Sequence, residues 1–160
     1  MLKSLLLSSV LLLSQSPNSN TEFVKLQNRL QDYGFKVNIA IPPDVRLPKQ
    51  QTDFLRRRLR KPYGLLSTKD KTIWINPVVF ELGIDRPVLI HEAVHAAQLC
   101  KGNGNIQALE LDLKPIAQAR PFFKRYLDSH RRELEQEAYA VQTQGDSYEL
   151  VLNLLDRYCQ

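Results

Sequence analysis

The sequence has few of the residues on which several classes of protein depend. It contains 3 histidines, 2 cysteines, 1 methionine and 1 tryptophan in 160 residues. Two cysteines cannot build a cysteine-rich scaffold, and they are not spaced as a CxxC metal site. No apolar run reaches the roughly 20 residues of a membrane-spanning helix, and no nucleic-acid motif accompanies the net charge of +5. We therefore expect no stable membrane span in the mature chain and no nucleic-acid partner.

The longest apolar run lies at the N-terminus and has the form of a secretory signal peptide. Lys3 precedes an apolar stretch over residues 4–13, which matches the charged and hydrophobic regions of such signals. We place the signal peptide and a short spacer at residues 1–20 and a single domain at residues 21–160. The mature protein is then exported, to the periplasm or to the extracellular space.

The two cysteines suit an exported protein, because disulfides form and persist in oxidising compartments. In the chain-entropy model a bridge between Cys100 and Cys159 would add roughly 4 kcal/mol to the stability. The alternative is a pair of buried free thiols.

The most informative segment, VLIHEAVHAA at residues 88–97, contains the pattern HExxH. On a helix, residues four apart lie about 6 Å apart on one face, so His91 and His95 can bind one metal ion while Glu92 reaches a water molecule beside it. The flanking residues are apolar nearly all round, which indicates a buried helix. Burying these polar groups is costly without a metal or polar partners. Imidazole ligands favour Zn²⁺, although other divalent ions suit similar sites.

This segment resembles the motif of the zincin metallopeptidases. The longer form HExxHxxGxxH is absent, so the resemblance points away from the metzincin branch and toward the gluzincin branch. In gluzincins the third metal ligand is a glutamate on a later helix. The resemblance implies that His91 and His95 are metal ligands and that Glu92 is the general base.

Two glutamates are candidates for the third ligand. Glu135, followed by Ala138, resembles the E-x-x-A pattern of several gluzincin families, and Glu137 matches the same pattern. Periodicity favours Glu137, which shares a helix face with Leu134. We assign Glu135 by resemblance and keep Glu137 as the alternative. Many relatives carry Asp or Asn at the position of Tyr139 to support a histidine, so the supporting residues are not identified here.

The remaining patterns predict an α+β fold like that of the smallest gluzincins. It has a short, mostly antiparallel sheet with an N-terminal helix, a buried HExxH helix and a helical C-terminal half. The expected elements are a helix over 22–33, a strand over 35–41, a helix over 49–60, a hairpin of strands 63–67 and 72–76, a motif helix starting at Asp85, and helices from about residue 105 to the end with breaks near Pro115, Pro121 and Gly145. The resemblance also implies that strand 72–76 lies at the rim of the cleft and pairs with extended substrate.

These observations predict a zinc-dependent hydrolase, a metallopeptidase acting on a peptide or protein. One alternative is a non-catalytic metal-binding or regulatory protein. Another is a basic module that binds an anionic partner through the run Arg56–Lys61, although such a run is more often the solvated side of a helix. The sequence does not indicate an oligomeric state.

Overall fold

The structure is a computed structural model that describes residues 17–43 and 62–160. Most of the predicted signal peptide, the predicted helix over 49–60 and the basic run at 56–61 lie outside these residues. The first described helix, α1 (Pro17–Asp32), begins earlier than the predicted start at residue 22. Proline is favoured in the first turn of a helix because its fixed φ suits that position and because the backbone N–H that it lacks would have no helical partner there.

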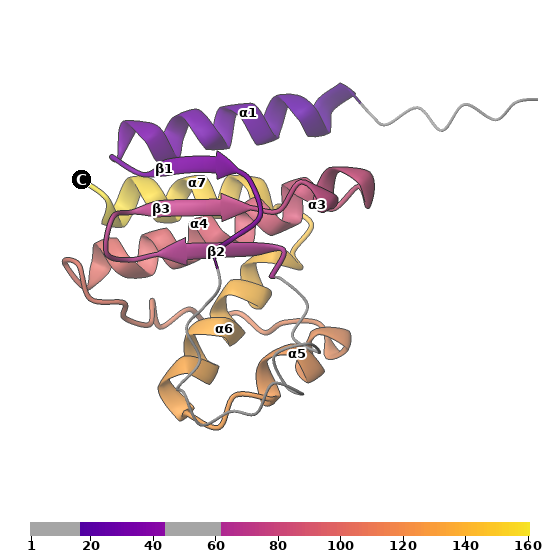
Figure 1. Cartoon of the computed structure of the whole chain (residues 1–160). Coiled ribbons are helices and arrows are strands. Elements are labelled where there is room, and N and C mark those ends of the chain that lie inside the picture. The colour runs from indigo at the N-terminus through magenta and orange to yellow at the C-terminus, as the bar shows by residue number, and fades with distance from the viewer. Residues whose placement is uncertain (1–16, 44–61) are drawn as a thin grey trace, which may run out of the picture.

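A small sheet of three strands packs beside α1 (Figure 1). Its strands are β1 (Lys36–Ile39), β2 (Gly64–Ser67) and β3 (Thr72–Ile75), in the order β1-β3-β2. The predicted hairpin is confirmed, because β2 pairs with β3 antiparallel. β1 pairs with β3 in parallel, with Val37 opposite Ile73. The sheet is therefore mixed rather than mostly antiparallel.

The strand order also changes which strand can meet a ligand. β3 is the central strand and has neighbours on both sides, so its backbone groups are already paired. The prediction that strand 72–76 offers free backbone groups to a peptide is therefore wrong. The reason is that β1 occupies the side of β3 that an isolated hairpin would leave open. In the described part of the chain, β2 is the edge strand on the other side.

The motif helix α4 (Asp85–Lys101) is the centre of the fold and follows the short helix α3 (Val78–Glu81). It contacts α1, α6 and α7 as well as β2 and β3, and Figure 1 shows it behind the sheet. Eleven of its residues are buried, in a continuous stretch broken only at His91. The α+β class and the buried motif helix are therefore as predicted.

The C-terminal half contains the 3-10 helix η1 (Ala117–Ala119) and helices α5 (Arg120–Lys124), α6 (Ser129–Gln142) and α7 (Ser147–Tyr158). The chain passes from α6 to α7 around Gly145, as predicted. The prediction of helix from about residue 105 is wrong, because residues 105–116 contain no helix. Three consecutive backbone N–H groups of that segment donate to the carboxylate of Glu137 instead of to helical carbonyls.

Two sets of contacts connect the end of the chain to the rest of the domain. Cys100 and Cys159 form a disulfide with a Cα–Cα distance of 5.1 Å, which joins the end of α4 to the end of α7. Asp156 accepts hydrogen bonds from Arg29 at 2.8 Å and from Tyr33 at 2.9 Å. These contacts hold α7 against both α1 and α4.

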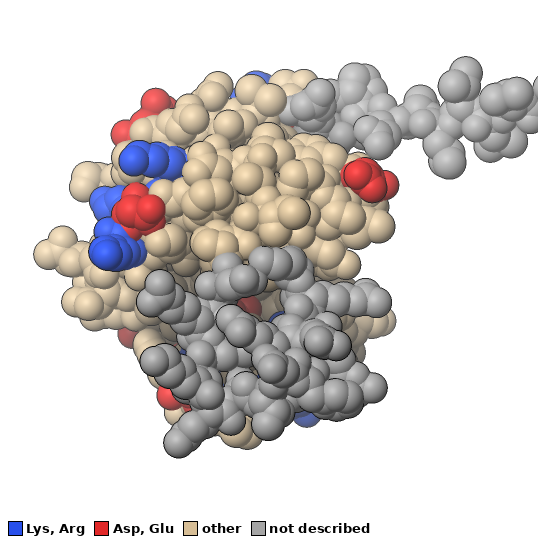
Figure 2. Space-filling model, in the orientation of Figure 1, with Lys and Arg blue, Asp and Glu red and all other residues tan. Residues whose placement is uncertain are grey.

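The surface view gives no sign of a single basic patch on the face that it shows. Lys and Arg side chains gather, mixed with acidic ones, at the end of the sheet that carries the turn between β2 and β3, and most of the described surface over α1 and the sheet is uncharged (Figure 2). None of the helices among the described residues is long and apolar enough to cross a membrane.

Candidate metal centre

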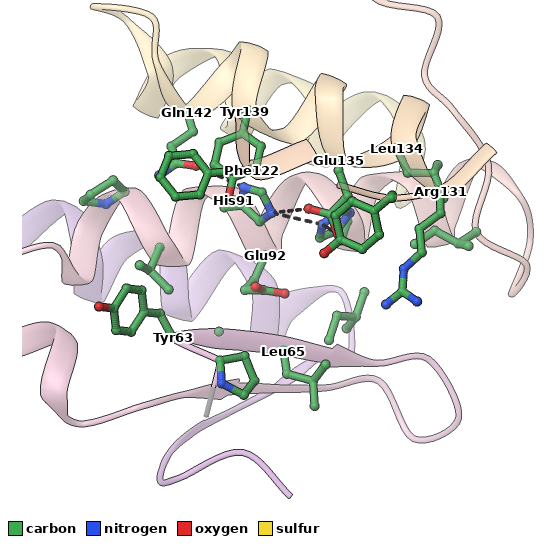
Figure 3. A pocket seen from close by; sticks show the side chains of 18 of the residues that line it. Tyr63, Leu65, His91, Glu92, Phe122, Arg131, Leu134, Glu135, Tyr139 and Gln142 are labelled. Carbon is green, nitrogen blue, oxygen red and sulfur yellow. Dashed lines mark hydrogen bonds and ion pairs between the residues drawn. The ribbon is translucent and has the colours of Figure 1, made fainter. Parts of the chain in front are cut away.

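Three side chains converge at the middle of α4 and α6. The Nε2 atoms of His91 and His95 lie 3.2 Å apart. The Glu135 carboxylate lies 3.3 Å from Nε2 of His91 and 3.9 Å from Nε2 of His95. Figure 3 shows Glu135 pointing from α6 toward His91 on the facing helix. His91, His95 and Glu135 thus form a cluster that could hold a metal ion.

The spacing of these atoms fits a tetrahedral site. Two ligands bound to zinc at about 2.0–2.1 Å in tetrahedral geometry lie about 3.4 Å apart. The distances of 3.2 and 3.3 Å that involve His91 are close to this value, and the distance of 3.9 Å from His95 to Glu135 is somewhat longer. The donor set of two imidazole nitrogens and one carboxylate oxygen leaves a fourth position open, as in catalytic zinc sites.

Each imidazole has its other nitrogen held by a glutamine. The Nδ1–H of His95 donates to Oε1 of Gln98 at 2.7 Å, and the Nδ1–H of His91 donates to Oε1 of Gln142 at 3.0 Å. The Gln98 amide is oriented by its own bonds, since its Nε2 donates to the Leu134 carbonyl and to Glu137. With the proton of each ring on Nδ1, both histidines can present an unprotonated Nε2 atom to a metal ion. Without a metal ion, a proton on one Nε2 atom satisfies the 3.2 Å contact between the two rings.

The sequence analysis did not identify these two glutamines, although the sequence contains a signal for each. Gln98 is a polar residue in the apolar stretch after His95, about one turn beyond it, and it is fully buried. Gln142 follows Glu135 by two helical turns and so lies on the same face of α6. At position 139, where the resemblance to gluzincins implies Asp or Asn, Tyr139 packs its ring against His91 at a centroid distance of 4.6 Å.

The alternative ligand Glu137 has another role. Its carboxylate accepts hydrogen bonds from the backbone N–H groups of Leu109 at 2.7 Å, Glu110 at 2.6 Å and Leu111 at 3.2 Å, and from Gln98 at 2.9 Å. Glu135 and Glu137 are two residues apart on α6, so they face different directions. The structure brings Glu135 to the histidines, and Glu137 holds the segment before α5. Periodicity favoured Glu137 as the third ligand, whereas the structure places Glu135 beside the two histidines.

Burial and charge set the protonation of the cluster. Burial and the charge of His91 lower the pKa of His95 to about 4, so its imidazole is neutral at pH 7. Burial opposes ionisation of Glu135, but its hydrogen bond with His91 and the charges of both histidines lower its pKa to about 2. Burial also disfavours charge on His91, but Glu135 and Glu92 outweigh that effect and raise the pKa of His91. The cluster therefore attracts positive charge.

Glu92 lies beside the cluster and is not part of it. Its side chain points away from α6, into the space between α4 and strand β2 (Figure 3), and it is only 6% exposed. Burial raises the pKa of its carboxyl to about 7, which is suitable for a group that accepts and returns a proton near neutral pH.

Gly64, the first residue of β2, leaves room for Glu92. A Cβ atom added at Gly64 would lie 2.5 Å from Oε1 of Glu92 and 2.7 Å from its Cγ. We expect Gly64→Ala to lower the free energy of unfolding by about 1–3 kcal/mol, the usual cost of overpacking. Urea denaturation measures this change. Gly145→Ala is the matched control, because a Cβ there meets nothing within 4 Å. If both variants have the same free energy of unfolding, the Glu92 side chain can shift to make room for the added Cβ atom, and the expected overpacking is absent.

The cluster lies at the base of a cavity of about 900 Å³. β2 forms one wall, and residues of α5 and α6 form the opposite wall. The lining residues that carry polar side chains are Tyr63, His91, Glu92, His95, Arg125, Tyr126, His130, Arg131, Glu135, Tyr139 and Gln142. This volume is within the range of clefts that bind small molecules or a stretch of peptide.

Comparison with known proteins identifies the family. The family model described as Domain of unknown function (DUF8637) matches residues 58–160. The chain belongs to this family. The matched range includes β2, α4 and α6, and therefore all the residues of the candidate metal centre. No curated protein and no solved structure matched the chain.

Proposed function

We propose that this member of the DUF8637 family is a zinc-dependent hydrolase, a metallopeptidase of the gluzincin type. The observation that carries the proposal is the convergence of His91, His95 and Glu135 at the base of an open cavity, with Glu92 beside them. The resemblance of the HExxH segment supports the same assignment. Zinc is proposed because two imidazoles and one carboxylate form a ligand set found in zinc peptidases.

Zinc in this position would supply a Lewis acid that polarises a carbonyl and lowers the pKa of water toward about 7. Glu92 accepts the proton of the attacking water at its carboxylate and later donates it to the leaving amine nitrogen. Its raised pKa suits both steps, because the carboxyl can exist in either protonation state near pH 7. Gln98 and Gln142 keep the proton of each imidazole on Nδ1, so that both Nε2 atoms remain available.

The substrate side of the proposal rests on the edge strand. β2 lines the cavity with Gly64, Leu65 and Leu66, and among the described strands it pairs only with β3. An extended peptide could add to such an edge through main-chain hydrogen bonds. The role that the sequence assigned to strand 72–76 therefore passes to β2. An exported location is also part of the proposal, since the disulfide would persist there.

Metal removal tests the proposal directly. We expect the purified protein to cleave a mixture of quenched fluorescent peptides, and 1,10-phenanthroline to reduce the rate by about tenfold or more because the Lewis acid is lost. Adding back Zn²⁺ after removal of the chelator should restore the rate. Zinc content by mass spectrometry accompanies each measurement. A rate that stays constant as zinc is removed would contradict the proposed metallopeptidase.

A further inference from the structure

The wall of the cavity opposite β2 carries two guanidinium groups on one aromatic ring. The Cζ atom of Arg131 lies 5.0 Å from the ring centroid of Tyr126, and that of Arg125 lies 5.5 Å from the same centroid. Cations are held over aromatic rings at such distances. Tyr126 also forms a side-chain hydrogen bond with Glu135 that helps to lower the pKa of that carboxyl. The two arginines are therefore held at the edge of the metal centre.

Both guanidinium groups are available to a ligand. Arg125 and Arg131 are exposed and line the cavity, and within residues 17–43 and 62–160 neither forms an ion pair. Figure 3 shows Arg131 extending from α6 past Glu135 into the cavity. Arg131 and the three residues of the cluster line the same cavity.

The charge balance of the cavity favours an anion. Among the described residues that line it, the acidic ones are Glu135, which belongs to the cluster, and Glu92, which lies beside it. A divalent ion there would offset these two carboxylates, so the charges of Arg125 and Arg131 would remain uncompensated. Guanidinium groups bind carboxylates through charge-assisted, often bidentate hydrogen bonds.

We propose that Arg125 and Arg131, held by the ring of Tyr126, form a subsite for a carboxylate of the peptide substrate. This inference rests on the proposed peptidase function and adds its specificity. The carboxylate is either the side chain of an acidic residue near the scissile bond or the free C-terminus of the peptide. Peptides with a carboxylate within reach of the subsite are then cleaved with a higher kcat/KM than neutral peptides of the same length.

The test compares peptides that differ by one charge. A quenched peptide with Glu at each position near the cleaved bond is compared with its Gln counterpart, each with a free and an amidated C-terminus. We expect kcat/KM to be about 10–100-fold higher for the peptide with the recognised carboxylate. Loss of the preference on Glu→Gln exchange identifies a side-chain carboxylate, and loss on amidation identifies the C-terminus. Equal kcat/KM for all four forms would overturn the subsite.

Variants of the subsite connect this preference to the two arginines. Arg131→Gln and Arg125→Gln should reduce the ratio of kcat/KM for the acidic peptide to kcat/KM for its neutral counterpart toward one. Arg131→Lys should retain part of the preference, and the preference should weaken as salt is raised. Lys124→Gln is the matched control, because it removes an exposed cation beside Arg125 that does not line the cavity. Unchanged preference in both glutamine variants would contradict the proposal.

A binding measurement separates this inference from the proposed function. Fluorescence anisotropy of labelled acidic and neutral peptides with the zinc-loaded protein reports the subsite without turnover. If no peptide is cleaved but the acidic peptide binds tighter and loses that advantage in Arg131→Gln, the peptidase assignment fails and the subsite stands. If neutral peptides are cleaved and acidic ones bind no tighter, the subsite fails and the peptidase stands.

Discussion

Glu92→Gln is expected to abolish most of the hydrolytic activity while leaving the metal centre intact. The amide has nearly the same shape as the carboxylate, but it cannot accept the proton of the attacking water. Loss of a general base typically lowers the rate about 10²–10⁴-fold. Glu92 is outside the cluster of His91, His95 and Glu135, so zinc content should remain at one ion per chain. The measurements are kcat/KM on a cleaved peptide and zinc stoichiometry by mass spectrometry.

The matched control for this variant is Glu133→Gln, which makes the same exchange at an exposed position of α6. It should keep the parent kcat/KM and the parent zinc content. If Glu92→Gln also keeps the parent rate, the general base is a different group. If neither the parent nor the variants cleave any peptide and all bind zinc, the non-catalytic metal protein becomes the better description.

Glu135→Ala is expected to lower the zinc affinity, whereas Glu137→Ala is expected to lower the stability of the fold. Glu135→Ala removes the proposed third ligand, and loss of a ligand should lower the metal affinity by more than the 10–100-fold that loss of a supporting residue costs. We expect zinc affinity to fall by about 100-fold or more, with little change in the stability of the metal-free chain. Glu137→Ala leaves three backbone donors without their carboxylate. The free energy of unfolding should fall by about 3 kcal/mol or more.

Two measurements on each variant distinguish these outcomes: zinc titration with a competing chelator, and urea denaturation of the metal-free protein. Glu137→Ala should still bind one zinc ion at saturation, with a weaker affinity because Gln98 loses a partner. Full zinc affinity in both variants would mean that the third ligand lies elsewhere. If Glu135→Ala alone severely lowers the free energy of unfolding, the roles assigned to the two glutamates must be reversed.

The sequence predicted correctly those elements that depend on the spacing of residues close together in the chain. The HExxH helix is predictable because its residues share one face and its flanks are apolar, and the β2–β3 hairpin follows from two apolar runs across a polar turn. The position of β1 was not predictable, because parallel pairing depends on a long connection that leaves no local pattern. The candidate ligand Glu135 came from resemblance, since periodicity favoured its neighbour.

The supporting residues of the site were missed for a related reason. Gln98 and Gln142 acquire their roles only when α4 and α6 pack together and place an amide oxygen beside each imidazole. Residues 105–116 were predicted as helix because nothing in their own sequence shows that Glu137 takes their backbone N–H groups. Long-range hydrogen bonds of this kind override local propensity.

The carboxylate of Glu137 also determines which substitutions the segment before α5 can tolerate. It recognises main-chain atoms, so the identity of the side chain at position 110 matters little to it, and the side chain of Glu110 is 81% exposed. The backbone there has φ of 62°, which glycine or asparagine adopts readily and proline cannot. Natural variation at this site should therefore favour glycine, asparagine and aspartate and exclude proline and β-branched residues, although the position touches no candidate metal ligand.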